Sequence, residues 1–97
     1  MSSILALHTV LQTSVTVSAS PIALPPELFG EQILRAVLTV ETDSIRIKTD
    51  GGNPSSGDGH LVRVGQRIVI EGPTDIANFR MVRSTTDATV TISLEAQ

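Results

Sequence analysis

The segment from Asp50 to Gly59 is the one stretch of this chain that resembles a ligand-binding loop. Its glycines could let backbone N–H groups line an anion, but it lacks the Gly-Lys-Ser/Thr ending of a phosphate loop and precedes a strand pattern. Asp50, Asn53 and Asp58 carry the oxygen ligands that calcium prefers, yet the terminal glutamate of an EF-hand loop is absent. We therefore expect a surface loop that holds no metal and no cofactor.

Residues suited to catalysis are few and scattered. His8 and His60 are the only histidines, the chain has no cysteine, and no serine lies in a G-x-S-x-G elbow. Glu27 and Glu31 have helical spacing, which is more typical of a solvated face than of an acid/base pair. The sequence therefore predicts that the protein is not an enzyme.

The distribution of charge is more informative than any motif. The first 26 residues contain no Lys, Arg, Asp or Glu, whereas the overall charged fraction of 18% would place about five there. The segment is too apolar for a chain that stays solvated; its large aliphatic residues are Ile4, Leu5, Leu7, Val10, Leu11, Val15, Val17, Ile22 and Leu24. We interpret this segment as a contact surface, either within its own domain or against another subunit.

Length and composition exclude several classes of protein. At 97 residues the chain is one domain with room for its own core. A net charge of −3 and a pI near 5.1 argue against a nucleic-acid binder. No apolar run is long enough to cross a bilayer, and the N-terminus lacks the positive region of a secretory signal.

Apolar and polar residues alternate in several short runs, which is the pattern of half-buried strands. The runs are Gln12 to Ser18, Ile33 to Glu41, Ser44 to Lys48, Arg67 to Glu71 and Thr89 to Glu95. Turn residues separate them at short intervals, and Pro73 to Asn78 is long enough for only one helical turn. The sequence predicts an all-β fold: a single small antiparallel β-sandwich or barrel-like domain with an N-terminal arm.

Residues 1–11 are predicted to form that arm, and residues 12–97 the β-sandwich domain. Ile4, Leu7 and Leu11 recur at helical spacing, while Leu5, Leu7 and Val10 also permit an extended form. The alternative is an edge strand packed on the domain's own core. Glu27 to Ala36 competes as a helix, but we expect only a short turn there before the strand.

All seven basic residues fall between Arg35 and Arg83. Those that the alternation places on outward faces are Arg35, Arg46, Lys48 and Arg67. Such residues can clamp carboxylates across a subunit boundary, or they can simply keep the surface soluble. The residues predicted to contact another subunit are Ile4, Leu5, Leu7, Val10, Leu11, Arg35, Arg46, Lys48 and Arg67.

A resemblance to a known class of protein lies between Ile45 and Arg83. It rests on the strand before Thr49-Asp50-Gly51-Gly52, the Gly59-His60-Leu61 return, the Gly65-Gln66 turn before an apolar strand, and Phe79-Arg80-Met81-Val82-Arg83. This stretch resembles small β-sandwich virion proteins of tailed bacteriophages, of the capsid decoration or cement type. These motifs describe a scaffold, not a reaction.

The resemblance implies a structural protein on the capsid surface of a virion, assembled in the host cytoplasm, whose partner is the major capsid (coat) protein. It also implies a homo-oligomer, with a trimer favoured because it suits local three-fold positions. The alternatives are a structural protein of the head-to-tail junction or tail, and a soluble ligand- or glycan-binding β module. The last is disfavoured because Trp and Tyr, which usually stack on sugars, are absent.

Overall fold

The computed structural model describes residues 8–24 and 33–96. These residues form seven strands and one short helix, in the order β1 (His8–Val17), β2 (Ile33–Thr42), β3 (Ile45–Lys48), β4 (His60–Val62), β5 (Arg67–Glu71), α1 (Pro73–Asn78), β6 (Arg80–Arg83) and β7 (Ala88–Ala96). All strand pairs are antiparallel. The predicted all-β fold is confirmed.

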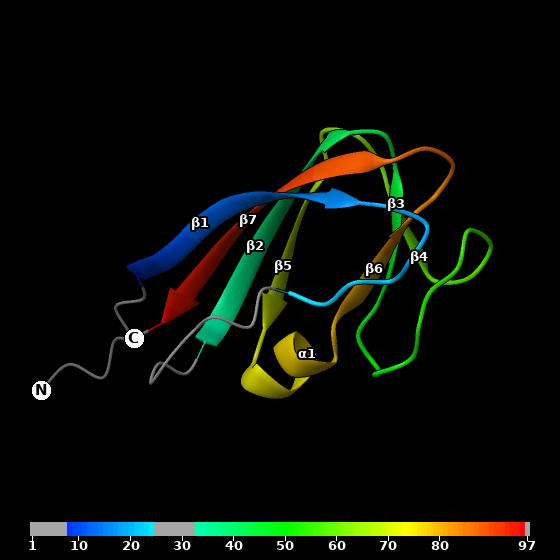
Figure 1. The fold of residues 1–97 in the computed structure, drawn as a ribbon. Coiled ribbons are helices and arrows are strands. Elements are labelled where there is room, and N and C mark those ends of the chain that lie inside the picture. The colour runs from blue at the N-terminus through cyan, green and yellow to red at the C-terminus, as the bar shows by residue number, and fades with distance from the viewer. Residues whose placement is uncertain (1–7, 25–32, 97) are drawn as a thin grey trace, which may run out of the picture.

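The strands form two sheets, as Figure 1 shows. The larger sheet has the order β1-β7-β2-β5, and the smaller has the order β4-β3-β6. The chain passes from the larger to the smaller sheet at Asp43, which adopts a φ of 55°. Asp tolerates this left-handed conformation better than most residues, so the turn between β2 and β3 can be tight.

The core lies between the inner faces of the two sheets. In β7 every second residue from Ala88 to Ala96 is buried, which is what the alternation predicted. The largest fully buried side chains are Phe79, Leu38, Ile45, Met81, Ile92, Leu94, Val17, Val40 and Val90. Among the described residues no polar or charged side chain is buried, so this core is aliphatic apart from Phe79 and Met81.

Two predicted strands differ from the observed ones. β1 begins at His8 rather than Gln12, because its first residues pair with the end of β7, and a bulge between Thr9 and Leu11 corrects the register. In β2 the alternation from Ala36 to Val40 implies that Leu34 also faces inward, but a second irregularity between Ile33 and Arg35 leaves Leu34 only half-buried, and Ile33 is buried instead.

Two strands were not predicted. β4 has three residues, which is too short for an alternating pattern to be recognised. In β6 the adjacent residues Met81 and Val82 are both buried, so alternation fails. The predicted single helical turn is present as α1, with Pro73 in its first turn where a missing N–H costs nothing.

Replacing Ile92 with alanine should lower the free energy of unfolding by about 2–5 kcal/mol, since a fully buried side chain in the central strand is removed. The matched control is Val69→Ala, another β-branched residue but 47% exposed on β5, which should cost less than about 1 kcal/mol. Urea denaturation of both variants measures the difference. Equal losses would contradict the assignment of the core.

Candidate interaction surface

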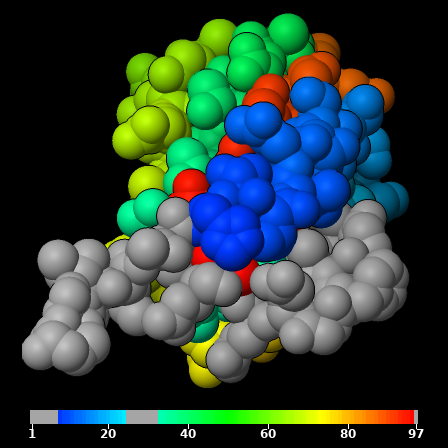
Figure 2. Space-filling model, turned by 90° about the vertical axis from the view of Figure 1, so that its left-hand side faces the viewer, coloured from blue at the N-terminus to red at the C-terminus, as the bar shows by residue number. Residues whose placement is uncertain are grey.

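The long edge of the larger sheet is formed by β1. This strand pairs with β7 along one side, from His8 opposite Ala96 to Val17 opposite Ala88. Within the part of the chain that the structure describes, no strand pairs with its other side. The described N-terminal residues therefore form a continuous strip of surface on one side of the molecule, drawn in blue in Figure 2.

Beside this edge, the outer face of β1 and β7 carries short uncharged polar side chains. They oppose one another in three cross-strand pairs: Gln12 with Ser93, Ser14 with Thr91, and Thr16 with Thr89. We call these six residues the neutral face. On β1 its members are exposed, and on β7 they are half-buried.

Hydrogen bonds link the neutral face from strand to strand. The Gln12 side-chain amide donates to the Ser93 hydroxyl at 3.0 Å. The Thr91 hydroxyl donates to the Glu41 carboxylate at 3.0 Å, and it lies 3.4 Å from the Ser14 hydroxyl. Because a hydroxyl has one hydrogen, Ser14 must be the donor to Thr91. These contacts restrict the side-chain orientations of four of the six residues, Gln12, Ser14, Thr91 and Ser93.

Charged residues border the neutral face at two places: the Glu41 carboxylate lies beside Thr91, and a charged row crosses the sheet near the start of β1. Arg35 on β2 lies opposite Glu95 on β7 and opposite Glu71 on β5. The Arg35 guanidinium forms an ion pair with Glu95, whose side chain is only 16% exposed. The charge of Arg35 is therefore largely satisfied within its own chain.

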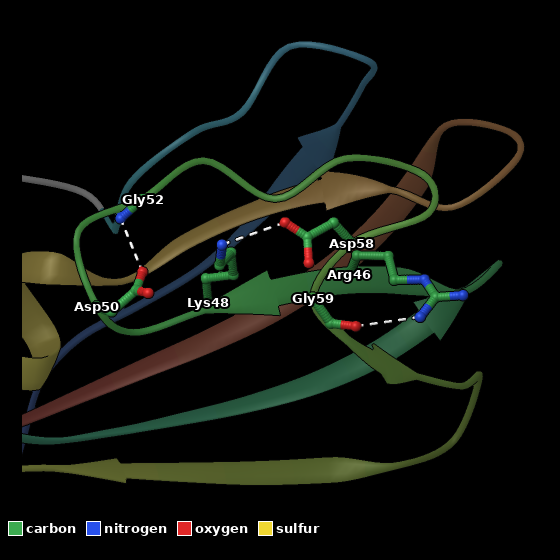
Figure 3. Close-up of polar contacts among 6 residues, drawn as sticks. All are labelled: Arg46, Lys48, Asp50, Gly52, Asp58 and Gly59. Atoms are coloured by element: carbon green, nitrogen blue, oxygen red, sulfur yellow. Dashed lines mark hydrogen bonds and ion pairs between the residues drawn. The ribbon is translucent and has the colours of Figure 1, made fainter.

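The cations of β3 also contact their own chain, as Figure 3 shows. Arg46 donates from Nη1 to the Gly59 carbonyl oxygen at 3.0 Å, and the Lys48 ammonium lies 3.2 Å from an Asp58 carboxylate oxygen. Both contacts hold the end of the loop between β3 and β4, where the chain leads into β4. These side chains therefore act first as positioning groups for this loop.

Both carboxylates of the loop have partners from the protein. Asp50 accepts the Gly52 backbone N–H at 2.8 Å, and Asp58 binds Lys48. An open hollow of about 450 Å³ lies here, lined by Lys48, Thr49, Asp50, Asp58, Gly59 and His60. Within residues 8–24 and 33–96, no group of three or more His, Cys, Asp or Glu side chains is placed to hold a metal ion.

The predicted contact residues fall in three places. Val10 and Leu11, assigned to the arm, belong to β1 and pack half-buried against the core. Arg35 and the exposed Arg67 lie on the larger sheet, whereas Arg46 and Lys48 lie on the smaller one, so the four cations do not form one patch. Ile4, Leu5 and Leu7 lie outside the described residues, as do Glu27 and Glu31.

His8 and His60 begin strands in different sheets, and the structure does not bring them into one site. The sequence placed Ser14, Thr16 and the β7 hydroxyls on polar faces, but it did not predict that these two strands pair. That pairing joins residues 81 positions apart, as Gln12 and Ser93 are, and short-range patterns carry no signal for it.

Comparisons with protein-family models, curated proteins and solved structures found no match to this chain. In the described part of the chain, no helix has the length and apolar character needed to cross a bilayer.

Gly59→Ala should destabilise the protein by about 1–3 kcal/mol. Gly59 has a φ of 117°, and an added Cβ would lie 2.8 Å from the Ile47 carbonyl oxygen. Gly57→Ala is the matched control, because nothing lies within 4 Å of a Cβ there, and we expect a change below about 0.5 kcal/mol. Chemical denaturation measures both, and an unaffected Gly59→Ala variant would show that the loop return is not held as described.

Proposed function

We propose that this protein is a structural component of a tailed-bacteriophage virion, and that it decorates the capsid exterior by binding coat subunits. The observation that carries the proposal is the neutral face beside the open edge of β1. Charged residues are costly to bury at an interface, and their depletion is typical of surfaces that become covered. The resemblance of the segment from Ile45 to Arg83 to small virion proteins supplies the biological setting.

The architecture suits a protein that works by contact. Two sheets pack around an aliphatic core, and the neutral face is held in place by cross-strand hydrogen bonds. A rigid surface loses little conformational entropy when it binds. Many copies on one shell would then add their individual contacts, so that each needs only modest affinity.

Coat binding would use different parts of the surface for different purposes. The neutral face supplies area that costs less free energy to desolvate than a charged surface would, while the exposed Arg67 on β5 remains available to pair with an acidic group of the coat. Arg35, Arg46 and Lys48 contribute less to such pairing because they already contact Glu95, Gly59 and Asp58.

The proposal predicts that purified particles of the phage that encodes this chain contain it in a copy number comparable to that of the coat protein. Quantitative mass spectrometry of the particles measures that number, and a cryo-EM map locates the copies. Density on the outer surface of the head is the expected result.

Other results would point elsewhere. A handful of copies at the neck or tail would replace decoration with a role at the head-to-tail junction or tail. Absence from purified particles would overturn the virion proposal and favour a soluble ligand- or glycan-binding module, which a glycan array would then test.

A further inference from the structure

The open edge of β1 differs from the other sheet edges that the structure describes. Edge strands with free N–H and C=O groups invite pairing, and proteins usually protect them with charge, shortness or cover. β5 has exposed Arg67 and Glu71 at its two ends, and β4 has only three residues. The edge of β6 is bridged, because Ile22 and Met81 exchange two backbone hydrogen bonds of 2.9 Å.

β1 has none of these protections in the described structure. It is ten residues long, and it contains no Lys, Arg, Asp, Glu or Pro. On its inner face Leu11 and Val15 pack against the core but remain only half-buried, so apolar surface is left at the margin of the sheet. An added strand would cover that surface and satisfy the free backbone groups together.

We propose that this edge binds β1 of a second copy of the chain, so that two four-stranded sheets join into one continuous sheet across a two-fold axis. The added strand must itself be long, uncharged and unpaired on one side. Among the described strands, β1 alone meets that requirement. A two-fold contact between identical patches is also the commonest arrangement of homo-oligomers.

The side-chain alternation restricts the register of this pair. In antiparallel strands, opposite residues lie on the same face, so inner residues must meet inner residues. A two-fold axis at Thr13 satisfies this condition and places Leu11 opposite Val15 of the partner subunit. It also places Gln12 opposite the partner's Ser14, which extends the neutral face across both subunits. No pair of like charges arises anywhere along the contact.

This pairing adds a specific contact to the assembly role proposed above. Only its location in a virion rests on that proposed function. The two remain separable, because pairing is measured on the isolated protein and decoration on the particle. A two-fold contact also differs from the trimer that the resemblance to virion proteins implies, and the mass of the protein in solution distinguishes them.

The test is a charge exchange at positions that face each other across the axis. In the double variant Gln12→Lys/Ser14→Lys, each lysine opposes a lysine of the other copy. The dissociation constant of the dimer should therefore rise about tenfold or more at low salt. In Gln12→Lys/Ser14→Glu, each lysine opposes a glutamate, so the dimer should persist. Both variants remove the same hydrogen bonds to Ser93 and Thr91, which makes them matched controls for folding.

Light scattering during size-exclusion chromatography measures the mass of each protein over a range of concentrations. Wild type should have twice the single-chain mass of 10.3 kDa. A wild-type monomer at every concentration, or a trimer, would overturn the proposal whatever the variants do. Equal weakening in the two double variants would overturn the register at Thr13. Thermal melting of each variant confirms that it is folded.

Discussion

The fold depends on the pairing of β7 along both of its edges. This strand lies between β1 and β2, and its inward residues supply a large part of the buried aliphatic core. Among the described strands β7 comes last in sequence order, so β1 pairs with a strand that lies far along the chain from it. A contact such as Gln12 with Ser93 joins residues 81 positions apart, and such distant pairings are costly in entropy and form slowly.

The pairing of β7 along both edges also accounts for the neutral face and for the position of β1 at the margin of the sheet. Because β7 pairs with β1 along one edge and with β2 along the other, β1 lies at the margin of this sheet, and none of the described strands pairs with its other edge. The hydroxyls of β7 then align with those of β1 to form the neutral face, while the charged row through Arg35 marks one end of it. The uncharged strand β1 and the Ser/Thr-rich strand β7 are far apart in the sequence. Their pairing brings them together into one surface.

The sequence predicted those parts of the fold that depend on local pattern. Alternation in Arg67 to Glu71 and in the last strand was strong enough to assign both strands and their inner faces. It failed where the local pattern breaks: β4 is too short, Met81 and Val82 are buried side by side, and the bulge after Thr9 hides the start of β1. Strand order was out of reach because it depends on pairing between residues far apart. The candidate surface was predicted only in part for the same reason: the uncharged lead was recognised, but its partner strand was not.

Hydrogen exchange of the β1 backbone amides, followed by NMR, tests most directly whether a second copy covers the open edge. In an antiparallel sheet the N–H groups of β1 alternate between those directed at β7 and those directed away. If β1 pairs with a second β1, both sets are protected at high concentration, and the outward set loses its protection on dilution while the inward set keeps it. Rapid exchange of the outward set at every concentration would contradict the account.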